Sequence, residues 1–261
     1  MSTKTVQGKL WSISPQNWST HFEPYFLPLY KTALDQLDIQ PETMLLDAGC
    51  GSGMFSSMAI DAGAQVIGID AAPGLLELAR QRNPQNNFME EDLEAMPFAS
   101  NSFQVVTGFN SFQYAGNFSQ ALKEAHRVLK PGGKLVLAIW DKPENSDGTT
   151  VLKAISTLLP PPSPGTPGPF ALSEDGKIEN YLQETGLKLI NRLKISCPFI
   201  YHSLGNGIRS FMGTGPAAAA LNYADKKQVE ETIAAALQPY RIVDDIYYQQ
   251  NSFLLFIAKK N

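Results

Sequence analysis

The most constraining feature of this sequence is a glycine-rich turn that begins directly after a short apolar run. The apolar residues 44–46 lead into the turn DAGCGSG at residues 47–53, and a helical pattern occupies residues 52–62. Glycines let the backbone approach a ligand closely, and the N-terminus of a helix favours a carboxylate or a phosphate. The sequence therefore predicts a strand, a ligand-binding turn and a helix in succession.

The spacing of the glycines separates this turn from a dinucleotide-binding turn. The pattern G-x-G-x-x-G, started at Gly49, would require a third glycine at position 54, where the chain has Met54. The last glycine is instead Gly53. This difference argues against bound NAD or FAD, and so against a nicotinamide-dependent oxidoreductase.

An acidic residue follows or ends each of three successive strand-like segments. These residues are Asp47, Asp70 at the end of QVIGID, and Asp92 at the end of the run 87–92. Ligands of parallel sheets bind outside the carboxyl ends of the strands, where a carboxylate such as Asp70 can accept hydrogen bonds from both ribose hydroxyls. Asp92 can accept from an adenine amine while Leu93 packs on the ring. One such acid alone would be read as a solvated loop carboxylate, whereas three favour a nucleoside-containing ligand.

Strand and helix patterns alternate through this part of the chain. Helical patterns at 72–82 and 118–130 separate apolar runs at 65–70, 103–110 and 134–140. Near-continuous apolar strands that alternate with helices indicate a parallel sheet covered on both faces. The fold class is therefore α/β.

Four segments in order resemble the motifs of class I S-adenosylmethionine (SAM)-dependent methyltransferases. They are LLDAGCGSG, VIGID, EEDLEAMPFASNSFQVV and RVLKPGGKLVLAIW, and the resemblance covers roughly residues 40–141. It is closest to the small-molecule branch that includes ubiquinone/menaquinone C-methyltransferases. The resemblance implies a Rossmann-like sheet of order 3-2-1-4-5-7-6 with strand 7 antiparallel. Strand 6 would lie at 187–201 and strand 7 at 252–259, with helical cap insertions.

The resemblance also assigns SAM as cofactor, with S-adenosylhomocysteine (SAH) as product, and residues that hold it. Gly49 and Gly51 would approach its methionine part, with Asp47 orienting the turn and reaching the amino group through water. Further cofactor-binding candidates are Asp70 at the ribose, the adjacent Ala71, Asp92 and Leu93 at the adenine, Asn110 at the methionine moiety, Gln113 as a pocket residue, and Trp18.

The chain divides into a core and caps. The expected segments are an N-terminal aromatic cap at 1–43, a SAM-binding core at 44–141, a proline-rich loop and cap at 142–170, a core helix and strand 6 at 171–201, a helical cap at 202–240, and closing strands of the core at 241–261. Within them, Ser173 is expected to cap a helix that runs to Gly186. The proline-rich stretch 160–169 is either a surface linker or the edge of a lid.

Methyl transfer is an in-line displacement that needs a general base only if the acceptor must lose a proton. The candidates for such a base are His21 in the aromatic cap and His202 beside the second cap, whereas His126 is expected to be structural. Trp18 either packs within its cap or turns its indole face toward the sulfonium, a cation–π contact. Cys50 is expected to be a buried filler, and no metal site is expected.

Composition narrows the functional classes. The chain has 261 residues and a formal net charge of −4, with no basic stripe, which argues against nucleic acid as a partner. No apolar run reaches the roughly 18 residues that span a membrane, and residues 1–10 lack an apolar signal core, so a cytoplasmic location is expected. Two cysteines form neither a disulfide framework nor a metal motif.

The sequence thus predicts a SAM-dependent methyltransferase that modifies an O, N or C atom of a small metabolite or peptide. The alternative is a noncatalytic SAM-binding sensor or partner subunit, which the same glycines and acids would serve. The acceptor and the oligomeric state are left open.

Overall fold

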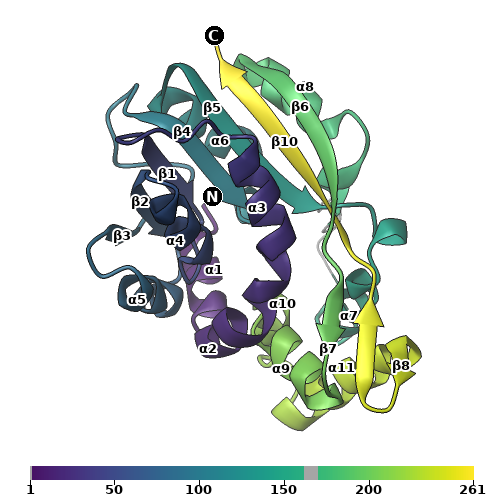
Figure 1. The fold of residues 1–261 in the computed structure, drawn as a ribbon. Helices are drawn as coiled ribbons and strands as arrows, with labels where there is room; N and C mark the ends of the chain where they lie inside the picture. The colour runs from purple at the N-terminus through teal and green to yellow at the C-terminus, as the bar shows by residue number, and fades with distance from the viewer. Residues whose placement is uncertain (1, 162–169) are drawn as a thin grey trace.

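The computed structural model describes residues 2–161 and 170–261 (Figure 1), so most of the proline-rich stretch at 160–169 lies outside the described residues. Its strands are β1 (Met44–Ala48), β2 (Gln65–Asp70), β3 (Asn87–Glu90), β4 (Phe103–Phe109), β5 (Leu129–Trp140), β6 (Leu187–Ser196), β7 (Phe199–Tyr201), β8 (Arg241–Val243), β9 (Ile246–Gln249) and β10 (Ser252–Lys260).

The helices fall between and beyond these strands. The α-helices are α1 (Lys4–Trp11), α2 (Pro15–Asn17), α3 (Leu27–Asp35), α4 (Met54–Asp61), α5 (Pro73–Arg82), α6 (Phe118–Val128), α7 (Gly148–Ser156), α8 (Lys177–Thr185), α9 (Leu204–Met212), α10 (Gly215–Ala220) and α11 (Lys226–Leu237). Short 3₁₀ or π turns are η1 (Trp18–Phe22), η2 (Glu23–Phe26), η3 (Phe112–Tyr114), η4 (Pro143–Asn145), η5 (Ala171–Ser173) and η6 (Gln238–Tyr240).

The main sheet has seven strands in the order β3-β2-β1-β4-β5-β10-β6. Neighbours from β3 to β5 pair parallel, and β10 pairs antiparallel with both β5 and β6. The predicted order, with only the last strand in sequence antiparallel, is confirmed.

Both faces of this sheet are buried, which explains its near-continuous apolar strands. Successive strand residues point to opposite faces. Leu45 accordingly belongs to the core that includes α3 and α4 residues, and Leu46 to the core that includes α6 and α8 residues. Figure 1 shows α3 and α6 on opposite faces of the sheet. Both leucines are fully buried.

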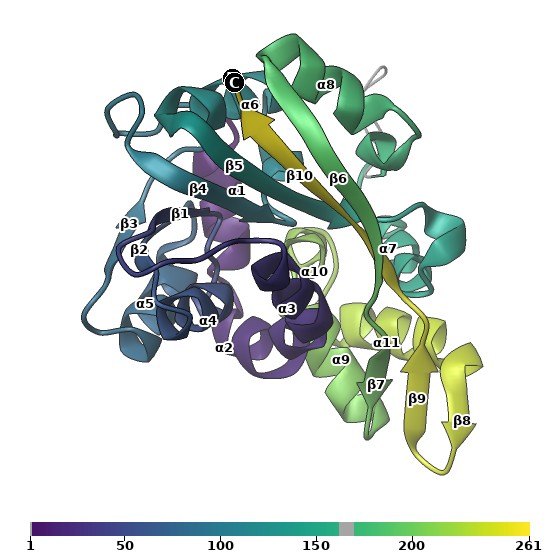
Figure 2. The ribbon, with the colours of Figure 1, turned by 45° about the horizontal axis from the view of Figure 1, so that its top comes forward.

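The predicted strand at 187–201 is divided in the structure. β6 ends at Ser196, and β7 leaves the main sheet to form a three-stranded sheet in the order β7-β9-β8. Pro198 lies between β6 and β7, and proline cannot donate the backbone hydrogen bond that a central strand requires. Of the closing segment 241–261, only β10 joins the main sheet, as the lower part of Figure 2 shows.

Two further boundaries differ from the sequence expectation. Ser173 is not the helix cap, because α8 begins at Lys177 after Gly176, while the buried Ser173 hydroxyl donates to the Trp140 carbonyl at 2.7 Å. The predicted helix end at Gly186 is correct. β5 begins at Leu129 and not at residue 134, because Leu129 already pairs with β4.

The two caps pack on each other through glycines. A Cβ on Gly213 would lie 2.4 Å from the Trp18 backbone nitrogen, and one on Gly215 would lie 2.7 Å from Trp11 Nε1. A third contact ties the N-terminal cap to the core, since a Cβ on Gly8 would lie 2.1 Å from the Ala71 carbonyl oxygen. These glycines therefore allow the caps and the core to come into close backbone contact.

Candidate functional site

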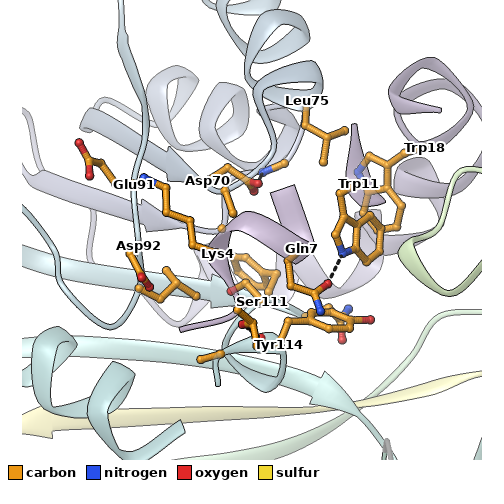
Figure 3. A pocket seen from close by; sticks show the side chains of 18 residues that line it. Lys4, Gln7, Trp11, Trp18, Asp70, Leu75, Glu91, Asp92, Ser111 and Tyr114 are labelled. Atoms are coloured by element: carbon orange, nitrogen blue, oxygen red, sulfur yellow. Dashed lines mark hydrogen bonds between the residues drawn. The ribbon is translucent and has the colours of Figure 1, made fainter. Parts of the chain in front are cut away.

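A pocket lies where the carboxyl ends of β1, β2 and β4 meet the N-terminal cap (Figure 3). Eight of the predicted cofactor-binding residues line it, namely Trp18, Gly49, Gly51, Asp70, Ala71, Asp92, Leu93 and Asn110. The structure thus brings together residues from the cap and from four successive strand ends. The lining residues that sequence analysis did not select are Thr3, Lys4, Gln7, Trp11, Leu75, Glu91, Phe109, Ser111, Tyr114 and Ala115.

The three glycines of the turn are required for different reasons, although all have positive φ. A Cβ on Gly49 would lie 2.1 Å from the Ser111 side chain, and one on Gly53 would lie 3.0 Å from Ala79 on α5. A Cβ on Gly51 would meet only two polar side-chain atoms, at 3.5 and 3.7 Å. Gly49 and Gly53 therefore serve packing, while a Cβ on Gly51, which lines the pocket, would make only ordinary van der Waals contacts.

Asp70 joins the glycine-rich turn to the end of β2. Its Oδ2 accepts from the Gly51 amide at 2.9 Å, and its Oδ1 accepts from the Ala72 amide at 2.8 Å. Burial raises the pKa of Asp70, and these backbone N–H groups act in the opposite direction. Its carboxylate lines the pocket and retains lone pairs for a ligand.

Asp47 lies beneath the turn and is not part of the pocket lining. It is 1% exposed, and it accepts hydrogen bonds from Ser56 Oγ at 2.7 Å and Thr107 Oγ1 at 3.0 Å. Burial raises the pKa of Asp47 to about 6. Its contacts join β1, β4 and α4, which suits the predicted role in orienting the turn but leaves it without direct access to the pocket.

The first residues of the chain cross the pocket beside Asp92. The Ser2 hydroxyl donates to Asp92 Oδ2, and the Thr3 hydroxyl donates to the Tyr114 carbonyl. Lys4 Nζ donates to the Glu90 carbonyl at 3.0 Å, and Figure 3 shows the Lys4 side chain extending on the side of Asp92. Sequence analysis missed these contacts because a polar N-terminal segment carries no local pattern that indicates where it docks.

Trp18 lines the pocket and also packs within its cap. Its ring lies edge-on to Trp11, with centroids 5.0 Å apart, and tilted against Phe22 at 5.4 Å. Trp11 Nε1 donates to Gln7 Oε1 at 3.2 Å. Trp18 Nε1 is buried and has no hydrogen-bond partner among the described residues. Both uses considered for Trp18, packing and ligand contact, remain compatible with its position.

Asn110 stands at the end of β4 with a φ of 49°, a conformation uncommon for a residue with a side chain. Its amide donates to the Ala138 carbonyl at 2.9 Å, and it lines the pocket. Gln113, predicted as a pocket residue, does not line it. Its Nε2 instead lies 3.4 Å from Asn110 Oδ1. Gln113 lies on the turn η3 and thus contacts Asn110, which lines the pocket, without lining the pocket itself.

Neither candidate base lines the pocket. His202 is exposed at the start of the second cap. His21 lies on η1, where burial and the Arg209 charge lower its pKa. His126 lies on α6, where its carbonyl accepts from Lys260 Nζ at 2.8 Å. The titratable side chains in the lining are instead Lys4, Asp70, Glu91, Asp92 and Tyr114.

An ion pair that sequence analysis did not select connects the N-terminal cap to the glycine-rich turn. Arg82, the last residue of α5, contacts Glu23 with Nη1 and Oε2 3.0 Å apart. The same nitrogen donates to the Ser52 carbonyl at 2.9 Å, while Nη2 donates to Ser19 Oγ at 2.9 Å. Glu23 is only 2% exposed. Glu23 and Arg82 lie 59 positions apart, and no local sequence pattern indicates that two such distant residues form a pair.

Residues 2–161 and 170–261 contain neither a membrane-spanning helix nor a metal-binding cluster. No helix there combines the length and apolar character needed to cross a membrane. Over the same ranges, no three His, Cys, Asp or Glu side chains are arranged to hold a metal ion.

Comparison with known proteins identifies the core. A family profile described as "Methyltransferase domain" matches residues 46–137. A demethylmenaquinone methyltransferase of Renibacterium salmoninarum is 36% identical over 113 residues, which cover 43% of this chain and 48% of that protein. A malonyl-[acyl-carrier protein] O-methyltransferase of Serratia marcescens is 36% identical over 98 residues, 38% of each chain. The chain thus matches about half or less of these relatives' length.

The fold similarity extends further than the sequence similarity. Geranyl diphosphate C-methyltransferase of Streptomyces coelicolor A3(2), solved with SAH, has a TM-score of 0.52 at 15% identity, covering 89% of this chain and 75% of that one. Such low identity establishes the fold alone. The profile match and the relatives show that residues 46–137 hold a methyltransferase domain similar to that of class I SAM-dependent methyltransferases such as the demethylmenaquinone methyltransferases, and the strand order agrees with this resemblance.

Proposed function

We propose that this chain binds SAM in the described pocket and transfers its methyl group to an O, N or C atom of a small molecule. One observation carries the proposal: the pocket lies at the strand ends of the methyltransferase domain, and the carboxylates of Asp70 and Asp92 both line it. Ligands of parallel α/β sheets bind at this edge. The family relation supports SAM as the ligand.

The proposed roles follow the order of the strands. Asp70 accepts from the ribose hydroxyls, and Asp92 accepts from the adenine amine while Leu93 packs against the ring. Gly49 and Gly51 allow close approach of the methionine part beside Asn110. Since Ser2 now donates to Asp92 Oδ2, the adenine amine would replace that hydroxyl.

When bound, SAM supplies a methyl group on a positively charged sulfur, which is already a strong electrophile. The chain's own contribution is to align the acceptor and to exclude water. Trp11, Trp18 and Tyr114 form an aromatic wall of the pocket. Because no histidine lines it, the site best suits an acceptor that needs no strong base, or one that is already acidic.

The aromatic wall of the pocket also supports a proposal for the class of methyl acceptor. Aromatic side chains offer apolar faces for a planar or apolar acceptor. The relatives are named for acceptors as different as demethylmenaquinone and malonyl-acyl-carrier protein. A planar, quinone-like small molecule is therefore our first choice, and a carrier- or peptide-bound carboxylate is the second to be tested.

Thermal denaturation with SAM, SAH and NAD tests the cofactor. A ligand that binds the folded state raises the melting temperature, so SAM and SAH should raise it and NAD should not. Formation of SAH with a panel of quinols, phenols and carboxylates then tests catalysis. A shift with NAD alone would refute the proposal. SAM binding with no SAH formed from any acceptor would favour the alternative, a noncatalytic SAM-binding sensor or partner subunit.

A further inference from the structure

We propose that the edge of the main sheet opposite the SAM pocket binds a phosphate-bearing small molecule. The site is a hollow at the amino-terminal ends of β1, β4 and β5, beside a row of lysine side chains. It shares no lining residue with the SAM pocket. The inference is therefore independent of methyl transfer, and it adds a second ligand site to the molecule.

The first observation is a row of like charges across three neighbouring strands, which Figure 2 shows side by side. Lys259 of β10 lies directly opposite Lys134 of β5 on one side and Lys188 of β6 on the other. Residues directly opposite each other share one face of a sheet, with Cβ atoms about 5 Å apart, and like charges there are destabilising. Val136 and Ile257, which point to the same face, belong to the core that includes α3.

The second observation is that this row has no carboxylate partner. Among the residues that the structure describes, the Lys188 and Lys259 side chains make no hydrogen bond or ion pair, and Lys134 Nζ donates to the Gln36 carbonyl at 3.2 Å. By contrast Lys260, which points to the other face, donates to two backbone carbonyls at 2.8 Å. A bound anion would offset the repulsion within the row.

The third observation is the hollow beside the row. Its volume of about 540 Å³ lies within the range of small-molecule sites, and its lining includes Lys130, Gly132 and Lys134. Gly132 joins the hollow to the row, since a Cβ built on it would lie 3.7 Å from Lys259 Cε. Lysines from β5 and β10 therefore meet at the hollow, although they come from distant parts of the sequence.

A second part of the lining limits the class of ligand. The segment between α3 and β1 contributes Asp38 and Glu42, both exposed, and Asp38 Oδ1 accepts from Gln40 Nε2 at 2.6 Å. A long polyanion such as a nucleic acid would extend its charges past these acids, whereas a single phosphate group can contact the lysines alone. Lysine ammonium groups bind phosphate as point charges. A small phosphate-bearing ligand thus suits this charge distribution.

Isothermal titration with inorganic pyrophosphate, at constant ionic strength, tests the site. The unaltered chain should bind pyrophosphate, and added SAH should change the affinity by less than about twofold, because the two sites share no residue. Lys130→Gln combined with Lys259→Gln should weaken binding by about tenfold or more, since two ammonium groups at the hollow are lost. Lys188→Gln, at the far end of the row, should weaken it by about two- to threefold.

A double variant on α11 provides the matched control. Lys226→Gln combined with Lys227→Gln removes the same amount of charge at exposed positions where each lysine already pairs with a glutamate four residues further on. Its affinity for pyrophosphate should stay within about twofold of the unaltered chain, because distant surface charges are screened by salt.

Melting temperatures without ligand separate binding from folding. Lys130→Gln combined with Lys259→Gln should melt at the same temperature as the unaltered chain or higher, because repulsion within the row is relieved. A lower melting temperature would show that these lysines support the fold, and would count against a ligand site.

Three further results would overturn the proposal. They are the absence of pyrophosphate binding, equal weakening in the two double variants, and displacement of pyrophosphate by SAH, which would place the anion in the SAM pocket. Selective loss of pyrophosphate binding in the Lys130 and Lys259 double variant supports it. Because the lysine variants locate this site without reference to SAM, a failure of the proposed function would leave this result unchanged.

Discussion

The core and the caps of this molecule differ in how far they follow known relatives. The methyltransferase profile matches residues 46–137, which hold β1 to β5, whereas the caps at 1–43 and 202–240 lie outside that match. Yet the pocket is built from both regions, because Trp11 and Trp18 line it together with Gly49 and Asp70. The comparison teaches that one wall of the pocket comes from the matched domain and another from segments outside it.

The first prediction addresses the core and has the largest expected effect. Asp70→Ala removes the carboxylate that accepts from the Gly51 and Ala72 amides and lines the pocket. Its affinity for SAH should fall by about a hundredfold, since a charged partner and the shape of the turn are lost together. Isothermal titration against Asp61→Ala, an exposed acid on α4, checks this. Equal affinities in the two variants would contradict the role of the core acids.

The second prediction concerns the contact between the caps. Gly213→Ala places a Cβ 2.4 Å from the Trp18 backbone, so the caps must separate. The free energy of unfolding should fall by about 1–3 kcal/mol, a typical cost of overpacking. Gly205→Ala lies on helix α9, which ends just before Gly213, and its Cβ meets its nearest atom, the end of a flexible arginine, at 3.5 Å; this variant should be neutral or slightly stabilising. Urea denaturation of both variants provides the measurement, and similar stabilities would refute the tight contact.

The third prediction uses the buried acid beneath the turn. Burial raises the pKa of Asp47 to about 6, above its ordinary value of 3.8. The folded chain therefore holds this proton more tightly than the unfolded chain, so the stabilising contribution is full below pH 4 and is lost as the pH rises through 6. Asp47→Asn should remove this slope, changing the stability difference between variant and unaltered chain by roughly 1–3 kcal/mol between pH 4 and 7. Parallel pH dependence of the two melting curves would contradict it.

The fourth prediction has the smallest effect and concerns the N-terminal segment over the nucleoside site. Ser2→Ala removes the hydroxyl that donates to Asp92 Oδ2. If the adenine amine takes that acceptor, SAH should bind about two- to fivefold more tightly, because one competing hydrogen bond of ordinary strength is gone. Ser102→Ala, whose hydroxyl donates locally to Ala99, is the matched control. Weaker binding by Ser2→Ala would show that Ser2 supports the bound ligand.

Sequence reasoning succeeded where the fold follows from local patterns. The turn at 47–53, the acid at the end of β2 and the alternation of strands and helices are patterns among near neighbours. They carry the family resemblance, and that resemblance implied the correct sheet order. It failed for Ser173 and for the strand at 187–201, because a hydroxyl bonded to a distant carbonyl and a strand that changes sheets are settled by contacts outside the segment.

The sequence by itself determined the core, since apolar periodicity, glycine positions and strand-end acids are encoded in adjacent residues. Only the tertiary structure decided which side chains meet at the site. It placed Asp47 beneath the turn, Gln113 behind Asn110 and both candidate histidines outside the pocket lining, and it brought Glu23 to Gly51. The physical reason is that such contacts join segments far apart in the chain, where close packing and the pairing of buried polar groups, and not local propensity, select the partner.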